Sequence, residues 1–172
     1  MNYITIDIET NGAIPETDDL LLLSATKISN GQITETFSKL VKPSRPQTDE
    51  LELFTGISND DLKNAESLQD VISEFNDFAK DCVIVSYDDF EYSFLESKGF
   101  KAEKVVYLRD YVKKTYPALE RYIADAVIIS LGLEEKLKEH LSSSMYYGKT
   151  RLFYSLKVAV IFLSLIENFL SE

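Results

Sequence analysis

Two acidic residues near the N-terminus, Asp7 and Glu9, have the types and spacing for metal-dependent chemistry. Hard divalent ions such as Mg²⁺ and Mn²⁺ prefer oxygen ligands, and two of them about 3.5–4 Å apart can clamp the attacking and leaving oxygens of a phosphodiester. Residues two apart on a strand project from the same face. The pair alone also fits a polar, solvent-facing edge, but the alternating Ile4, Ile6 and Ile8 predict a strand with one buried face.

The first part of the chain has the pattern of three antiparallel strands. Residues 3–8 alternate and are rich in β-branched and aromatic types, and Thr-Asn-Gly at 10–12 closes this predicted strand with turn chemistry. Runs 20–28 and 32–41 are two further strands. They are joined by Ser-Asn-Gly at 29–31, and Asn-Gly between two such runs is the strongest short signal for a hairpin.

The pattern becomes helical from residue 48 to residue 79, with Ser67 as an expected N-cap. Residues 82–85 form a short continuous apolar run, as expected for a strand buried on both faces. A helix over 90–97 should end at Gly99. The remaining expectations are a fifth strand over 105–108, helices over 110–115, 119–131 (ended by Gly132) and 151–170, and a loop over 141–149.

This order of elements predicts an α/β fold. Three antiparallel strands are followed by shorter parallel strands in a mixed sheet, with helices on both faces. The length and the absence of a linker predict a single domain over residues 1–172.

Composition narrows the protein class. The single cysteine, Cys82, excludes an intramolecular disulfide and a cysteine-rich zinc site, and it fits a cytoplasmic protein best. No targeting segment is visible at the start of the sequence. The longest apolar stretch, residues 152–170, contains Lys157 and Glu167, so we expect a buried amphipathic helix and no membrane contact.

The formal net charge of −11 argues against broad electrostatic adhesion to nucleic acid, which requires a basic footprint. It is compatible with an enzyme that uses metal ions to bridge its own carboxylates to a phosphate. Residues 101–121 form the one locally basic segment. A solvated helix face explains this segment better than a nucleic-acid contact surface.

The segment Ile-Asp-Ile-Glu-Thr-Asn-Gly at 6–12 resembles the first motif of the DnaQ-like (DEDD) 3′–5′ exonuclease family, in which a hydrophobic strand ends in Asp-x-Glu-Thr-x-Gly. The likeness continues in order over nearly the whole chain. Segments that resemble the family are residues 40–43, 52–58, 65–78, 83–86, 90–95 (the second motif) and 122–133.

The resemblance implies a ribonuclease-H-like fold and a 3′–5′ exonuclease site. Asp7, Glu9 and Glu91 would be the catalytic and metal-binding residues, with Mg²⁺ or Mn²⁺ as the cofactor. Thr10, Asn11 and Gly12 would bind the substrate. The implied partners are a single-stranded DNA or RNA 3′ end or a nucleotide, together with a polymerase or another protein.

The second motif departs from the family pattern. Glu91 replaces the usual Asp, and the extra methylene moves the carboxylate by enough to cost about 10²-fold in rate. Tyr87 and Asp88 stand where the family has His-Asn. Asp88 or Asp89 could compensate, although surface acids that cap a helix explain them better.

The third motif departs further. Alignment on residues 159–165 puts Lys149 at the family's histidine and Tyr154 at its aspartate, and no Asp occurs after Asp125. The only histidine, His140, has no carboxylate at motif spacing and fits a surface residue better than a general base. Lys149 could occupy the space of a missing metal, as a cation can.

Two functions therefore stay open. The first is an active, metal-dependent 3′–5′ exonuclease with an altered site and no identified general base. The second is an inactive exonuclease fold that serves as a nucleic-acid-binding or protein-interaction module. The intact first motif favours the former, and the acidic charge and altered third motif favour the latter.

Overall fold

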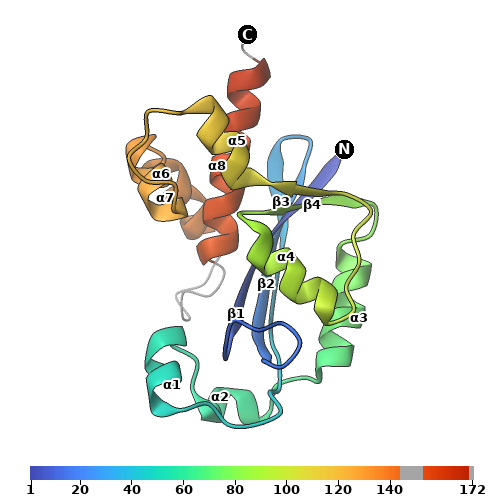
Figure 1. Cartoon of the computed structure of the whole chain (residues 1–172). Coiled ribbons are helices and arrows are strands. Elements are labelled where there is room, and N and C mark those ends of the chain that lie inside the picture. The colour runs from blue at the N-terminus through green and yellow to red at the C-terminus, as the bar shows by residue number, and fades with distance from the viewer. Residues whose placement is uncertain (144–152, 171–172) are drawn as a thin grey trace.

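The computed structural model describes residues 1–143 and 153–170, and within them five strands form one mixed sheet in the order β3-β2-β1-β4-β5 (Figure 1). β1 pairs antiparallel with β2, and β2 with β3, whereas β1–β4 and β4–β5 are parallel. This confirms the predicted mixed sheet. The strands are β1 (Asn2–Thr10), β2 (Leu20–Ser29), β3 (Gln32–Leu40), β4 (Cys82–Ser86) and β5 (Val105–Tyr107).

The predicted hairpin between β2 and β3 is confirmed. Asn30 has φ 53° and Gly31 has φ 75°. A two-residue turn whose twist matches the strands requires positive φ at both central positions, which Asn and Gly adopt most readily.

Eight helices complete the described part of the chain. They are α1 (Asp49–Thr55), α2 (Asn59–Lys63), α3 (Leu68–Phe78), α4 (Asp89–Ser97), α5 (Leu108–Thr115), α6 (Ala124–Ser130), α7 (Glu134–Ser143) and α8 (Phe153–Leu170). Ser67 caps α3 as predicted. Gly99 and Gly132 follow α4 and α6 with positive φ.

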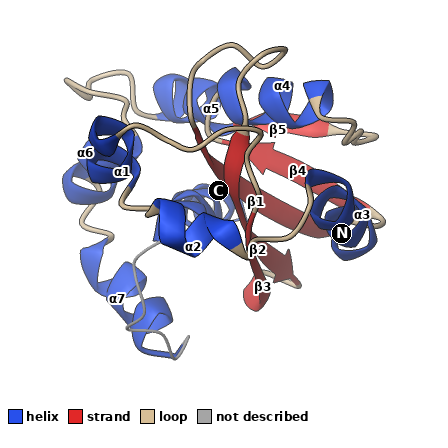
Figure 2. Cartoon of the chain, turned by 90° about the horizontal axis from the view of Figure 1, so that it is seen from below, coloured by secondary structure: helices blue, strands red, loops and turns tan. Residues whose placement is uncertain are grey.

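Helices cover both faces of the sheet, as predicted. On one face Ile4, Ile6 and Ile8 of β1 join the buried residues of α3 and α4 in one core. On the other face the buried residues of α5, α6, α7 and α8 form a second core with Val85 of β4. Figure 2 shows α3 and α6 on opposite sides of the strands.

Buried hydroxyl groups fix α8 on the sheet. The Thr5 Oγ1 donates to the Ser155 carbonyl at 2.8 Å, and the Ser155 Oγ lies 3.1 Å from the Thr26 Oγ1. These three residues are fully buried. Further along, the Phe162 ring lies 4.8 Å from the Tyr3 ring. Because Ser155 meets Thr5 and Phe162 meets Tyr3, α8 runs antiparallel to β1, with its first turn toward the end of β1.

Two expectations about the C-terminal half were wrong. Residues 134–143 form α7, and the predicted loop therefore overlaps its last turn at 141–143; residues 144–149 lie outside the described part. Among the side chains described in α7 only Leu137 is fully buried, so the sequence has little helical periodicity there. The predicted helix over 119–131 begins only at Ala124, so residues 119–123 form a loop that follows Pro117. A hydrogen bond from the Tyr122 hydroxyl to the Tyr116 carbonyl, at 3.0 Å, holds this loop in place.

The predicted helical stretch 48–79 is divided into α1, α2 and α3. The bounds of the predicted strands and of the helices over 90–97 and 110–115 agree within two residues, and residues 105–107 form the predicted fifth strand. Within the described ranges, no helix has both the length and the apolar character that crossing a membrane requires.

Replacing Ser155 with Ala should lower the free energy of unfolding by about 1–2 kcal/mol, because the buried Thr26 hydroxyl loses its partner. Urea denaturation measures this change. Ser130→Ala, at an exposed position in α6, is the control and should change stability by less than about 0.5 kcal/mol. Equal effects would contradict the role assigned to the Ser155 contact.

Candidate active site

The two sequence motifs meet at one edge of the sheet. β1 and β4 are parallel, with Tyr3 opposite Val83 and Thr5 opposite Val85, so their carboxyl ends lie side by side. Ligand sites in open α/β sheets form outside the carboxyl ends of parallel strands. Asp7 and Glu9 lie near the end of β1. Directly after β4, α4 begins and carries Glu91 in its first turn.

Asp7 is the electrostatic centre of this edge. Burial raises the pKa of its carboxyl well above the usual value, and the negative charges of Glu9 and Glu91 raise it further. The Ile8 backbone N–H and the Lys157 ammonium lower the pKa of this carboxyl. The predicted residues Asp7, Glu9 and Glu91 are therefore close enough to repel one another.

Glu91 is anchored to the end of β4. The Ser86 Oγ donates to its Oε2 at 2.9 Å. Burial, and then the Asp88 charge, raise the pKa of Glu91 to about 7, against the lowering effect of hydrogen bonds from the Ser86 hydroxyl and the backbone.

The two neighbouring acids have different positions. Asp88 is the N-cap of α4, where its side chain accepts from the Phe90 backbone N–H at 3.1 Å. Its carboxylate also pairs with the Arg109 guanidinium at 3.1 Å. Asp89 is exposed in the first turn of α4. Helix capping thus accounts for Asp88.

The turn after β1 has a fixed internal structure. The Thr10 Oγ1 donates to the Gly12 carbonyl at 2.6 Å, and the Asn11 side chain exchanges hydrogen bonds with Asp19 at 3.0 and 2.7 Å. A Cβ built on Gly12 would lie 2.1 Å from a carboxylate oxygen of Asp18, so a larger residue there would displace the carboxylate that accepts from the Ile14 backbone N–H at 2.8 Å. The predicted substrate-side residues Thr10, Asn11 and Gly12 are held rigidly beside Glu9.

The first turns of α8 contribute a residue that the sequence analysis missed. Lys157 is 4% exposed, and its Nζ forms an ion pair with Asp125 of α6. The same Nζ lies 4.1 Å from the centre of the Tyr154 ring. Burial raises the pKa of Tyr154, and the charges of Asp125, Asp7 and Glu9 raise it further. The cation beside Asp7 is thus Lys157, whereas Lys149 lies outside the described residues.

His140 lies away from this edge. It lines a cavity of about 370 Å³ with Gly31 and Gln32 of the β2–β3 hairpin and Val160 of α8. That hairpin follows Ser29, which pairs with Asn2 at the opposite end of β1 from Glu9. The structure therefore gives His140 no place beside the carboxylates.

The carboxylate edge, formed by Asp7, Glu9 and Glu91, carries oxygen donors of the kind that a hard divalent ion prefers. Across residues 1–143 and 153–170, no three acidic, histidine or cysteine side chains form a ready-made cage for an ion. Mg²⁺, however, is usually bound by one or two carboxylates together with water and a substrate phosphate. Asp7 and Glu9, on one face of β1, provide such donors. Asp125 is already paired with Lys157.

Replacing Glu91 with Gln should stabilise the protein at pH 8 by roughly 1–2 kcal/mol, given that the side chain is still partly exposed. The folded pKa is raised, so the folded state is most favoured below pH 4.5 and loses this advantage as the pH rises through about 7. Wild type should therefore gain stability between pH 8 and pH 5.5, and Glu91→Gln should gain less.

Thermal denaturation at the two pH values tests this. Glu103→Gln, an exposed carboxylate outside the site, is the control and should keep the wild-type pH dependence. An unchanged pH dependence in Glu91→Gln would show that Glu91 is not held in the environment described.

The fold is shared with solved exonuclease structures. A full-length 3′-exonuclease superimposes with a TM-score of 0.78 at 18% identity, over 97% of this chain and 60% of that one. Exonuclease X, solved with 5′ overhanging duplex DNA, gives 0.72 at 16% identity, over 96% and 92% of the two chains. At such identities the likeness concerns the fold alone.

Sequence comparison identifies the family. The DNA polymerase III PolC-type of Thermotoga maritima is 33% identical over 137 residues, which are 76% of this chain and 10% of that protein. The PolC-type polymerase of Streptococcus pneumoniae is 28% identical over 139 residues, 80% of this chain and 9% of the polymerase. The chain thus spans about a tenth of the length of these relatives. The RNase_T family model, described as "Exonuclease", matches residues 4–143. The chain therefore belongs to the exonuclease family and has the fold of a DnaQ-like 3′–5′ exonuclease domain.

Proposed function

We propose that this chain is a single exonuclease-like domain, residues 1–172, that binds the 3′ end of single-stranded DNA or RNA through a divalent ion, Mg²⁺ or Mn²⁺. Asp7 and Glu9 would hold the ion, with Glu91 beside them. When bound, such an ion neutralises phosphate charge and lowers the pKa of bound water. The protein residues fix where the 3′ end sits.

The observation that carries this proposal is the placement of Asp7 and Glu9, on one face of β1, beside the end of β4, where Ser86 holds Glu91. The like charges there repel one another. A half-buried carboxylate next to two like charges is unfavourable by itself, and folding normally avoids it. A cation bound at this edge would relieve the repulsion and would also attract a phosphate. Strain of this kind is typical of functional sites.

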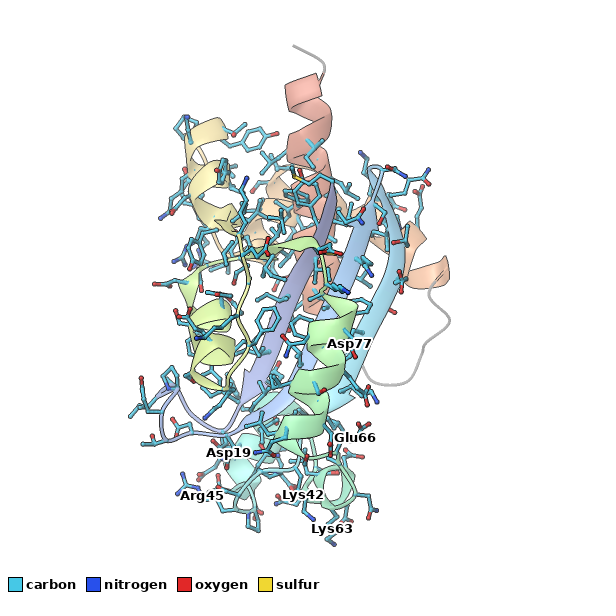
Figure 3. All side chains as sticks on the ribbon, turned by 90° about the vertical axis from the view of Figure 1, so that its right-hand side faces the viewer. Asp19, Lys42, Arg45, Lys63, Glu66 and Asp77 are labelled. Atoms are coloured by element: carbon cyan, nitrogen blue, oxygen red, sulfur yellow. The ribbon has the colours of Figure 1, made fainter. Side chains whose placement is uncertain are left out.

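An exposed cation near the Thr10–Gly12 turn, Arg45, gives the nucleic acid a second contact. Asp19, which holds Asn11, also accepts from the Ser44 backbone N–H and hydroxyl at 3.1 and 2.8 Å. Arg45 follows Ser44 and is exposed. Figure 3 shows the side chains labelled Asp19 and Arg45 at the end of the molecule where β1 ends. A guanidinium there suits a phosphate of the strand that leads to the 3′ end.

Wild type should bind a 5′-fluorescent single-stranded oligonucleotide at least about tenfold more tightly in Mn²⁺ than in EDTA. Asp7→Asn and Glu9→Gln should lose this difference, because each removes a proposed ion ligand. Fluorescence anisotropy with DNA and RNA oligonucleotides, each with a free or a blocked 3′ end, measures the effect.

Asp110→Asn, at an exposed position of α5, removes the same charge outside the site and should behave as wild type. Binding that does not depend on Mn²⁺, or that survives both site substitutions, would overturn the proposed function.

Arg45→Gln should weaken oligonucleotide binding and reduce the slope of log K against log salt by about 1, because one phosphate contact is lost. Anisotropy titrations at several salt concentrations measure the slope. Lys138→Gln, a lysine on α7 outside the site, is the control. Identical slopes for the two variants would remove Arg45 from the binding surface.

Hydrolysis is the second candidate function. Asp7, Glu9 and Glu91 stand at positions of the first two motifs and meet at one edge, while no general base is assigned. Denaturing gels of the same samples decide between the two. Shortening from the 3′ end in Mn²⁺, absent in Asp7→Asn, would establish a 3′–5′ exonuclease.

The similarity to PolC-type polymerases suggests a DNA polymerase as a protein partner, and the single cysteine suits a reducing, cytoplasmic setting. Co-purification with a bacterial replicative polymerase tests the proposed polymerase partner.

A further inference from the structure

Lys157 is a buried cation at a place where an exonuclease site is expected to bind metal. Its side chain is only 5% exposed, and it belongs to the long apolar helix α8. Lysine is almost never fully buried unless its charge is compensated, because desolvating an ammonium costs several kcal/mol. The structure must therefore compensate this charge locally.

Asp125 and Tyr154 supply part of that compensation. The Asp125 carboxylate, in the first turn of α6, forms an ion pair with the Lys157 Nζ. The face of the Tyr154 ring lies 4.1 Å from the same nitrogen, within the range of a cation–π interaction. Two elements thus hold the ammonium in one place.

The direction of α8 brings this ammonium toward the carboxylate edge. Ser155 contacts Thr5, and Phe162 contacts Tyr3, so the start of α8 faces the half of β1 that carries Asp7. Side chains on a helix lean toward its N-terminus, so the Lys157 chain extends from its own turn toward Tyr154 and that half of β1. Thr5 and Asp7 project from the same face of β1. The lowering effect of Lys157 on the pKa of Asp7 agrees with this placement.

We propose that the Lys157 ammonium, held by Asp125 and Tyr154, is a built-in counter-ion of the carboxylate edge that takes the place of a second divalent ion. The site then accepts one divalent ion, beside Glu9. This inference deepens the proposed function and rests on its ion site. It also assigns roles to Tyr154 and Asp125: they position the ammonium.

Lys157→Met removes the charge and keeps the length and apolar stem of the side chain. The carboxylate edge then lacks its internal cation, so the variant should bind Mn²⁺ at least about tenfold more tightly than wild type, or bind one more ion. Calorimetric titration with Mn²⁺ gives affinity and stoichiometry without any nucleic acid. Lys138→Met, on exposed α7, is the matched control and should titrate as wild type.

Asp125→Asn gives a second test that leaves Lys157 itself in place. It removes the negative partner of Lys157 on α6, so the ammonium acts more strongly on Asp7 and Mn²⁺ affinity should fall several-fold below that of the exposed control Asp110→Asn. The inference is overturned if wild type binds two ions, if folded Lys157→Met binds Mn²⁺ no better than wild type, or if Lys157→Met does not fold and the two Asp variants titrate alike. Loss of oligonucleotide binding alone would overturn only the proposed function, because these titrations contain no oligonucleotide.

Discussion

The placement of the half-buried Asp7 carboxylate beside the negative charges of Glu9 and Glu91 is the constraint on which the rest of the site depends. Each additional negative charge makes the others harder to keep ionised, so the fold must hold them together against their repulsion. It does so by placing them on rigid elements. Asp7 and Glu9 belong to the part of β1 that pairs with β2, and Glu91 is hydrogen-bonded to Ser86 at the end of β4. A positively charged ligand would relieve the repulsion among these carboxylates.

The two layers of helices have different roles around this edge. On one face the isoleucines of β1 pack against α3 and α4, which fixes the helix that carries Glu91. On the other face the hydroxyl contacts of Ser155 with Thr5 and Thr26 fix α8, which carries Lys157. Helices from both faces of the sheet thus contribute a charged side chain that acts on Asp7, which is Glu91 from α4 and Lys157 from α8.

The sequence predicts the sheet well because its signals there are local. Alternation in β1, the Asn30-Gly31 turn and the apolar run of β4 each specify their element, and the order of the elements specifies the mixed sheet. The sequence does not predict the role of the Lys157 cation. Lys157 lies within an apolar run and has no motif spacing, and its role depends on Asp125, 32 residues away on another helix. Only the packing of α6 against α8 reveals the pair. Glu134–Ser143 was missed for a related reason, since α7 buries little on its own and is recognisable mainly through its tertiary neighbours.

We propose that one divalent ion, and not two, completes this carboxylate edge. Anomalous diffraction from crystals soaked with Mn²⁺ and a nucleoside monophosphate tests it directly, because each Mn²⁺ gives its own peak. We predict a single peak that contacts Asp7, Glu9 and the phosphate, with the Lys157 ammonium still paired with Asp125. Two peaks with Lys157 displaced, or a phosphate bound without any Mn²⁺ beside Asp7, would contradict it.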